Sequence, residues 1–551
     1  MSGYYDLVIR NGKVIDGTGD PYVLCDIAVK DGNIADIGNI IKKETKEIDA
    51  EGHFVVPGFI DLHNHLDQGI LQFPRAESHI MQGVTSAVVG NCGMSMAPCE
   101  TSTLELLKNY NEPFLPSMSN YQWDWTDLSD FLKKVEEQNI TVNLIPLVGH
   151  GTLRIAVKGF SNEALDAEEM ERMKELLRKC LEDGAWGLSS GLIYPPGTYA
   201  DENELIEITK VLSEYGGIYT SHIRNEGGFL IESVKEAIRI GEENGIPVQI
   251  SHHKALSSSN WGKVEQTLLL VKEARERGVD VAVDVYPYTA VSTTITSLLP
   301  SWALEGGIAA MLGRLEDPAA RDQIFRTVKE PPGRGESLLK DVKWENIKIC
   351  ECAAKPEYEG LTLHEICGTN SFGKESLERF LDLLSEIRGN ATMAVFAMDE
   401  SDVETVIASP FSSIISDAWV TSPDAGGKPH PRAYGTFPRV FSKYVRERKI
   451  LSIEEAVKKM TSMPAERIGL SDRGILKTGF KADIVIFNGE EINDRATFRD
   501  PHQYPEGIKY VIIDGKIVVE DGVFSGVRPG IVLKRENVSE INPDNPVNLN
   551  I

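Results

Sequence analysis

The chain has 551 residues, 41% of them hydrophobic, which is enough to bury one large core and a smaller one. Its formal net charge of −26 argues against nucleic acid as a partner, because a protein without a basic face repels phosphate. Residues 1–20 lack the apolar segment of a signal peptide, and no run of about 18 apolar residues occurs, so we expect a cytoplasmic protein without a membrane span. The seven scattered cysteines favour free thiols over a disulfide framework.

Both ends of the chain are predicted to be β-structure. Residues 5–30 and 482–520 each contain short β-rich runs around turn pairs such as Asn11-Gly12 and Asp514-Gly515, which are hairpin signals. Neither end has enough strands to close a core alone. We therefore expect residues 1–55 and 466–551, the latter including a C-terminal tail, to form one small β-sandwich beside the central domain.

Strand-like and helix-like segments alternate through the centre of the chain. The eight predicted strands end at His65, Gly93, His150, Leu192, Arg224, Lys254, Tyr288 and Ala418. One of the helices between them is expected over Asp166–Asp183, with Gly184 as its stop signal. This pattern predicts an α/β protein with a TIM-type (β/α)8 barrel over residues 56–465, whose active site lies at the C-terminal ends of the strands.

The last two predicted strands lie too far apart for an ordinary loop between them. Residues 289–412 separate them, and we expect about 289–390 to form an inserted lid with its own helices. A further strand is expected at Thr392–Met398.

Potential metal ligands follow several of the predicted strands. They are His63 and His65 after strand 1, Cys92 after strand 2, His222 after strand 5, His252 after strand 6 and Asp417 after strand 8. In a strand, residues i and i+2 face the same side, so His63 and His65 can bind one ion together. A thiolate with two imidazoles is a zinc set that leaves a fourth position open, which predicts a tight site at Cys92, His222 and His252. His63, His65 and Asp417 would form a second position bridged by Cys92, whose occupancy the sequence leaves open.

Asp417 also has the chemistry of a general base. Amide hydrolysis needs a nucleophile, electrophilic help at the carbonyl and a proton for the leaving nitrogen. A carboxylate on the wall opposite the metal can take a proton from the attacking water and later hand it to the amine. Two plainer interpretations stay open here: Asp417 as a helix cap, and Cys92 as a small buried hydrophobe.

Six further motifs occur in order along the chain. They are Val89-Gly-Asn-Cys92-Gly, Leu147-Val-Gly-His150-Gly, Gly187-Leu-Ser-Ser-Gly-Leu-Ile-Tyr194-Pro-Pro-Gly197, Ser221-His222-Ile-Arg224, Ser251-His252-His253-Lys254 and Pro429-His-Pro-Arg432. Together with the two histidines of the first strand, they resemble the N-acyl-D-amino-acid deacylases, or D-aminoacylases, of the metal-dependent amidohydrolase superfamily. The likeness runs from about residue 5 to 535. Two departures are Ala418, where the family usually has glycine after the aspartate, and a longer lid.

The resemblance implies roles for residues that spacing alone does not assign. In the family, the positions of Lys254, Tyr286 and Arg432 hold the α-carboxylate of the substrate, and arginine supplies a bidentate grip. Tyr194 is expected to add a hydrogen bond to the developing oxyanion. One tightly bound zinc is implied to suffice for activity. The preference for the D-enantiomer comes only from the resemblance.

The sequence thus predicts a zinc-dependent hydrolase that cleaves N-acyl-D-amino acids, small-molecule substrates, to a carboxylate and a free D-amino acid. The run Thr289–Ala303 has no basic residue before Arg314, which favours neutral or hydrophobic side chains. A cyclic amidase of the hydantoinase or dihydroorotase kind is the second enzymatic interpretation, disfavoured because Leu192 and Ile193 stand where those enzymes place a carboxylated lysine. A non-catalytic amidohydrolase-like scaffold is a third, and it would be marked by lost ligands. The oligomeric state is left open.

Overall fold

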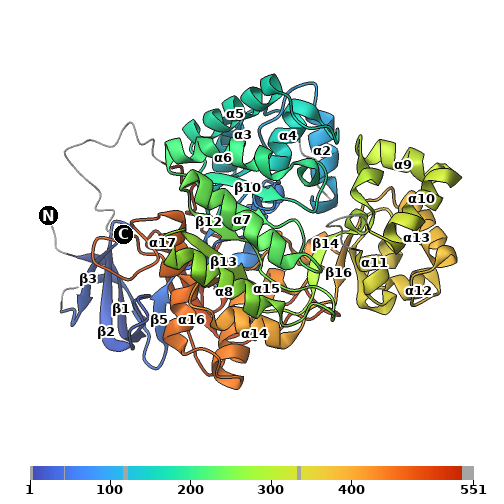
Figure 1. Cartoon of the computed structure of the whole chain (residues 1–551). Helices are drawn as coiled ribbons and strands as arrows, with labels where there is room; N and C mark the ends of the chain where they lie inside the picture. The colour runs from blue at the N-terminus through green and yellow to red at the C-terminus, as the bar shows by residue number, and fades with distance from the viewer. Residues whose placement is uncertain (1–3, 42–43, 116–121, 332–336, 536–551) are drawn as a thin grey trace.

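Strands from both ends of the chain share one sheet. In the computed structural model, which describes residues 4–41, 44–115, 122–331 and 337–535, nine strands run in the order β21-β20-β19-β18-β5-β1-β2-β3, with β4 paired to β1. They are β1 (Tyr5–Val14), β2 (Val23–Lys30), β3 (Asn33–Gly38), β4 (Glu44–Asp49), β5 (Phe54–Pro57), β18 (Ile484–Phe487), β19 (Ile508–Ile513), β20 (Lys516–Glu520) and β21 (Val523–Phe524). β18 pairs antiparallel with β5, so the two ends meet inside the sheet (Figure 1). Residues 536–551 of the expected tail lie outside the described residues.

The central part of the chain forms two parallel sheets. One has the order β6-β7-β8 and the other β9-β10-β11-β12-β13-β17. The strands are β6 (Phe59–Asp61), β7 (Val84–Val89), β8 (Asn143–Pro146), β9 (Val148–Gly149), β10 (Gly187–Gly191), β11 (Ile218–His222), β12 (Val248–Ile250), β13 (Val281–Val285) and β17 (Ser412–Ile414). Only Leu147 separates β8 from β9, so the two sheets follow each other directly along the chain. Every residue of β7 is buried, as expected for a parallel strand covered on both faces.

Two backbone hydrogen bonds join the loop after β6 to the loop after β17. The amide of Asp417 donates to the carbonyl of His63 over 2.9 Å, and the amide of His65 donates to the carbonyl of Ala418 over 2.9 Å. These bonds bring the first and the last strand of the central region together at their carboxyl ends. The mixed helix-and-strand order is the α/β class that the sequence predicts.

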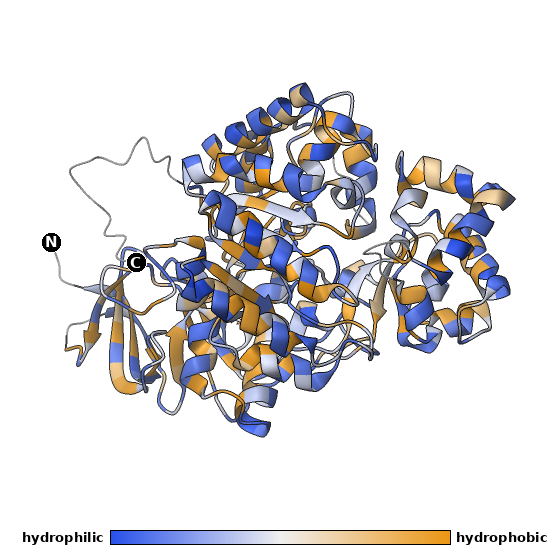
Figure 2. Ribbon diagram, in the orientation of Figure 1, coloured by the Kyte–Doolittle hydropathy of each residue, from blue (hydrophilic) through white to orange (hydrophobic). Residues whose placement is uncertain are grey.

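Helices cover the outside of the central strands. The helix expected at Asp166–Asp183 is α5 (Ala167–Glu182), which begins at a capping box between Asp166 and Glu169. Its apolar residues, among them Met173 and Leu177, face the core. The next helices of this layer are α6 (Glu202–Tyr215), α7 (Leu230–Asn244) and α8 (Lys263–Glu276). In Figure 2 these helices alternate between hydrophilic and hydrophobic colour along their length, as expected for helices with one buried and one exposed face.

A helical lobe is inserted between β13 and β17. It contains a small antiparallel sheet of order β14-β16-β15, with β14 at Val291–Thr294, β15 at Ile347–Glu351 and β16 at Thr392–Val395. Its main helices are α9 (Ile308–Glu316), α10 (Pro318–Lys329), α11 (Leu338–Asp341), α12 (Leu363–Cys367) and α13 (Lys374–Glu386). In Figure 1 this lobe stands apart from the terminal sheet, on the other side of the central strands. We call the described residues from 289 to 390 the lid.

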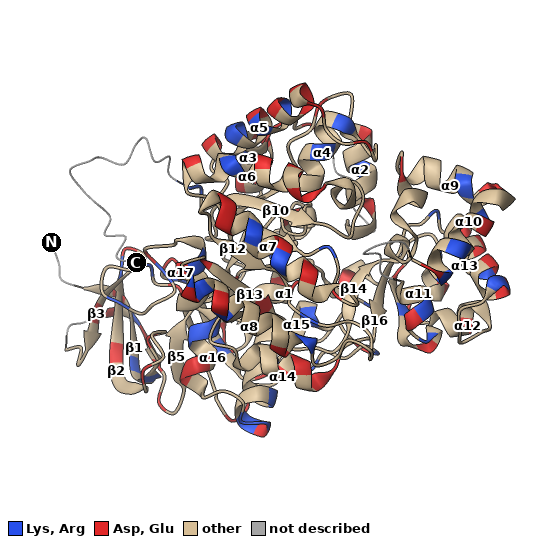
Figure 3. Cartoon of the chain, in the orientation of Figure 1, with Lys and Arg blue, Asp and Glu red and all other residues tan. Residues whose placement is uncertain are grey.

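Charged residues are frequent along the helices. Figure 3 shows acidic and basic residues on the helices of the central region, such as α5, and on those of the lid, such as α10 and α13. Within the residues that the structure describes, no helix combines the length and the apolar character needed to cross a membrane. All seven cysteines are free thiols.

Candidate active site

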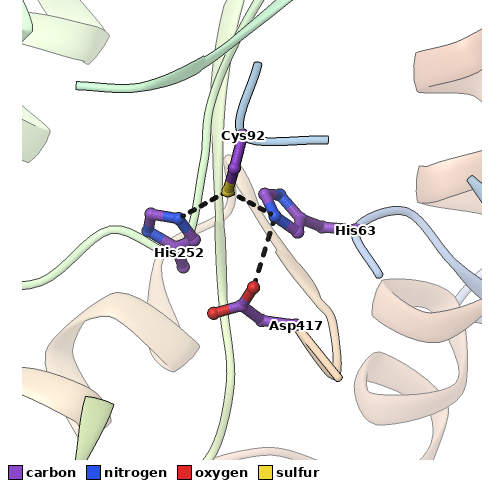
Figure 4. A group of neighbouring side chains, drawn as sticks. All are labelled: His63, Cys92, His252 and Asp417. Atoms are coloured by element: carbon purple, nitrogen blue, oxygen red, sulfur yellow. Dashed lines mark hydrogen bonds and ion pairs between the residues drawn. The ribbon is translucent and has the colours of Figure 1, made fainter. Parts of the chain in front are cut away.

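Four buried side chains from separate loops meet above the central strands. Cys92 Sγ lies 3.3 Å from His63 Nε2 and 3.5 Å from His252 Nε2, and His63 Nε2 lies 3.4 Å from Asp417 Oδ1 (Figure 4). One ligand atom from each of these residues lies within 4.8 Å of all the others. We call His63, Cys92, His252 and Asp417 the first ligand group. A thiol, two imidazoles and a carboxylate at these separations can converge on one metal ion.

Backbone conformation explains why these ligands lie beyond the strands rather than in them. Cys92, His252 and Asp417 have positive φ angles of 53°, 35° and 52°, which a strand residue cannot adopt. The predicted strand ends at Gly93, Lys254 and Ala418 are therefore too late, since β7, β12 and β17 end at Val89, Ile250 and Ile414. The carboxylate of Asp284 accepts a hydrogen bond from the amide of His252 and so holds this loop.

The two histidines of the first predicted strand also lie outside it. β6 ends at Asp61, so the expectation that His63 and His65 share a strand face is wrong. Both imidazoles still reach Asp417, since His65 Nε2 lies 3.3 Å from the same carboxylate oxygen that His63 approaches. The ring of His65 stacks on Trp419, with the centroids 4.6 Å apart. Hydrogen bonds to the loop after β17, rather than strand pleating, align the pair.

His222 belongs to a second group of potential ligands with Glu226 and His252. His222 is the last residue of β11, and its Nε2 lies 4.0 Å from a carboxylate oxygen of Glu226. Neither ring nitrogen of His222 has a hydrogen-bond partner, although the residue is buried. The predicted tight site pairs Cys92 with His222 and His252, whereas the first ligand group joins Cys92 to His63. The assignment of the tight zinc to Cys92, His222 and His252 therefore stays a prediction.

Glu226 is a residue of this site that the sequence did not single out. Its Oε1 lies 3.1 Å from His252 Nδ1, and it forms a buried ion pair with Lys254. Lys254 Nζ also lies 2.7 Å from His252 Nδ1. Metal-binding histidines commonly form a hydrogen bond to a carboxylate through the ring nitrogen that does not bind the metal. This bond fixes the orientation of the ring. The available signal was an acidic residue four positions after His222, just past a strand end.

The electrostatics of the site fit a bound cation. Burial raises the pKa of the Cys92 thiol well above its usual value, so a thiolate here needs positive charge beside it. Burial also lowers the pKa of His222 far below its ordinary value, which keeps the ring neutral and its nitrogens free to bind a metal. A buried thiol, neutral imidazoles and the unpartnered nitrogens of His222 form the donor chemistry of a zinc site.

Asp417 is held ionised by its neighbours. Burial alone would raise its pKa, but Arg432 and the nearby imidazoles outweigh burial and hold the pKa well below the usual range. Arg432 Nη1 lies 2.7 Å from Asp417 Oδ2. Asp417 is therefore a carboxylate at neutral pH, which is the form that accepts a proton.

The three residues predicted to hold the substrate carboxylate lie together, with Lys254 and Arg432 over the ring of Tyr286. The guanidinium carbon of Arg432 lies 4.8 Å and Lys254 Nζ lies 5.6 Å from the ring centroid of Tyr286. The hydroxyl of Tyr286 donates to the sulfur of Met398 over 3.6 Å. Tyr194 lies elsewhere on the wall, where its hydroxyl is 2.8 Å from Thr293 Oγ1 of β14 and its ring is 5.2 Å from that of His222.

The ligands open into a cavity of about 310 Å³. It is lined from the side of the central strands by Cys92, His222, His252, Asp417, Lys254 and Tyr194. Leu298, Leu299, Pro300, Trp302 and Val328 line it from the lid. We call this space the catalytic cavity. A neighbouring cavity of about 430 Å³ lies on the other side of Trp419 and Phe114, whose rings stack 4.9 Å apart, and Arg432 lines that second space.

Comparison with known proteins places the chain in a family. The Amidohydrolase family matches residues 46–310 and 388–519, and the unmatched interval between them lies within the lid and contains β15 and α13. The N-acyl-D-glutamate deacylase of Alcaligenes xylosoxydans xylosoxydans is 34% identical over 539 residues, which cover 97% of this chain and 98% of that protein. The chain belongs to the amidohydrolase family and, within it, to the N-acyl-D-amino-acid deacylases, as the motifs predict.

Two solved structures share this architecture. A D-aminoacylase, described as having a binuclear metal centre with one-metal activation and second-metal attenuation, has a TM-score of 0.79 at 33% identity and covers 96% of this chain and 100% of its own. The N-acyl-D-glutamate deacylase of Bordetella bronchiseptica, in complex with zinc and a phosphonate mimic of the tetrahedral intermediate, has the same TM-score at 32% identity and the same coverage. Identity alone therefore does not separate an N-acyl-D-glutamate deacylase from a D-aminoacylase.

Proposed function

We propose that this protein is a zinc-dependent hydrolase that cleaves the amide bond of N-acyl-D-amino acids with neutral side chains, giving a carboxylate and a free D-amino acid. The observation that carries the proposal is the first ligand group, in which a cysteine, two histidines and an aspartate from separate loops meet in a buried cluster. Similarity over almost the whole chain to enzymes of this activity supports it.

The donor set suits one tightly held zinc and, through His65 and the remaining ligands, a second of lower affinity. Cys92, His222 and His252 would hold the tight ion, and His63, His65 and Asp417 the weaker one. Bound zinc would act as a Lewis acid and would lower the pKa of a water molecule toward about 7, so that hydroxide becomes available at neutral pH. Asp417 then acts as the proton carrier, because it is ionised and sits beside the ligands.

Binding of the substrate is assigned to the residues around Tyr286. Lys254 and Arg432 each place a positive charge over this ring. Lys254 is already paired with Glu226 and Arg432 with Asp417, and a substrate carboxylate would be a further anionic partner for both cations. Tyr194 keeps its proton, since burial raises its pKa well above the usual value. Its hydroxyl can therefore donate to the developing oxyanion.

The neutral side-chain preference rests on the lid wall of the catalytic cavity. Among the described residues from 291 to 338, those that line the cavity are all uncharged. Arg314 instead donates to the backbone carbonyls of Ala303 and Glu305, and Arg224, which does line the cavity, is bound by Glu236. An acidic side chain would lose its hydration here without finding a free partner.

The same proposal includes the architecture. We infer that the two parallel sheets form one eight-stranded barrel, in which β8 and β9 count as a single strand interrupted at Leu147. The bonds between the loops after β6 and β17 would close it. The division into a terminal β-domain at 1–55 and 466–551, a barrel at 56–465 and a lid at 289–390 is likewise proposed. A cyclic amidase gains no support from β10, because Leu192 and Ile193 follow it and offer no bridging lysine.

Metal analysis followed by side-by-side kinetics tests the proposal. The purified protein should contain about one zinc per chain and should hydrolyse N-acetyl-D-leucine, N-acetyl-D-methionine or N-acetyl-D-phenylalanine. The matching L-compounds, hydantoin and dihydroorotate serve as comparisons. Faster turnover of an L-compound, or of either ring amide, would contradict the proposal.

A further inference from the structure

A small apolar cavity adjoins the catalytic cavity between the barrel and the lid. It encloses about 90 Å³ and shares Met94, Phe114, Tyr194 and Ser297 with the catalytic cavity. Among the described residues that line it, none is charged. We call this space the annex. Its walls suit a hydrocarbon group rather than a polar one.

The annex is a built feature and not a loose gap. One wall is α2 (Leu104–Asn111) with Phe160, and the facing wall is the start of α9, as Figure 1 shows for the two helices. The amide of Gly306 donates to the carbonyl of Phe160 over 3.1 Å, which ties the two walls together. Leu106 and Phe160 belong to one apolar cluster, so the barrel wall is packed from behind.

The position of the annex identifies its occupant. In the proposed substrate, the carboxylate and the side chain are attached to the α-carbon, whereas the acyl chain begins at the carbonyl carbon. Tyr194 is assigned to the carbonyl oxygen and lines both cavities. Lys254, Tyr286 and Arg432 do not line the annex. A group that enters the annex from the reaction centre is therefore the one attached to the carbonyl carbon.

We propose that the annex binds the distal carbons of the N-acyl group, so that this enzyme prefers acyl chains longer than acetyl. The inference rests on the proposed function and deepens it. The annex has the volume of about three water molecules, and a methylene group is about the size of a water molecule. Gly306 and Ala309 at its far end are exposed to solvent. The preference should therefore rise to about the six-carbon acyl chain and then level off.

Chain-length kinetics on the intact zinc enzyme test this directly. N-Acetyl-, N-butanoyl-, N-hexanoyl- and N-octanoyl-D-leucine are compared by kcat/KM. Each methylene that leaves water should raise kcat/KM by up to about fourfold, and we expect at least about a tenfold rise from acetyl to hexanoyl. A flat or falling series overturns the annex proposal. Failure to hydrolyse any of the four compounds overturns the proposed function itself.

A pair of tryptophan substitutions separates the annex from general effects. Ala309→Trp fills the far end of the annex and should reduce the hexanoyl-to-acetyl ratio of kcat/KM by at least about tenfold. Ala319→Trp places the same ring on an exposed site of α10 that lines neither cavity, and it should leave the ratio unchanged. If Ala309→Trp changes the preference between D-leucine and D-alanine at constant acyl group instead, the annex holds the side chain and the proposal is wrong.

Discussion

The two sides of the catalytic cavity differ in backbone, charge and role. On the side of the central strands, Cys92, His252 and Asp417 hold left-handed backbone conformations and carry buried polar groups. Such residues cost roughly 1–3 kcal/mol each and persist only where the surrounding structure enforces them. On the lid side, the described residues that line the wall from β14 to α10 are all uncharged, and they combine apolar side chains with serine and threonine hydroxyls. The proposed chemistry thus lies on strained loops after the central strands, and the proposed fit to the substrate lies on an insertion.

The largest effect is expected from Cys92→Ala on the side of the central strands. Cys92 is the thiol of the first ligand group and is predicted to hold the tight zinc, so metal and activity should both fall to background. Elemental analysis and turnover of the purified variant measure this. Cys180→Ala, which removes a buried thiol from α5, should keep both. Full zinc retention by the Cys92 variant would refute its role as a ligand.

Asp417→Asn should separate metal from chemistry. The amide keeps the shape of the carboxylate but cannot carry the proton, so turnover should fall by about a thousandfold while zinc is retained. Asp494→Asn is the matched control, since Asp494 is also paired to an arginine, Arg439, but does not line the catalytic cavity. A rate within about tenfold of the parent would show that another group is the base.

Glu226→Gln tests whether the carboxylate positions His252 toward the metal. Removing such a partner typically weakens metal binding by about 10- to 100-fold, and competition with a chelator measures this apart from activity. Glu236→Gln is the control, because Glu236 on α7 is also a buried carboxylate but is paired with Arg224. This variant should leave zinc affinity unchanged. Equal zinc retention by the two variants would reduce Glu226 to a structural partner of Lys254.

The smallest expected effect lies on the lid side. N-Acetyl-D-leucine, -methionine or -phenylalanine should have a kcat/KM at least about tenfold above N-acetyl-D-glutamate or -aspartate, because the uncharged wall leaves an acidic side chain unpaired. The L-enantiomers should be weaker still. An acidic substrate ranking first would show that the lid supplies a cation to the cavity, and the contrast between the two sides would then fail.

Much of the site is contained in short sequence signals. Each ligand follows a strand in a chain whose strands alternate with helices, so the family and the pool of ligands can be predicted. The ends of the strands cannot be predicted in this way, because the left-handed turn at Cys92 or Asp417 depends on bonds to residues far along the chain. One such bond is the hydrogen bond that the amide of Asp417 donates to the carbonyl of His63. Glu226, the partner of Lys254, was not predicted for the same reason. An acidic residue after a strand has many alternative fates, and only the fold places Glu226 beside both Lys254 and His252.

By itself, the sequence determined the α/β class, the family and the residues able to bind zinc, because these depend on periodicity and on local motifs. Tertiary structure alone decided how the ligands group, which charges neutralise one another and where the apolar spaces lie. The physical reason is range: a motif fixes neighbours along the chain, whereas the contact of Cys92 with His63 and His252 joins three loops. The annex between α2 and α9 depends likewise on how the lid packs against the barrel.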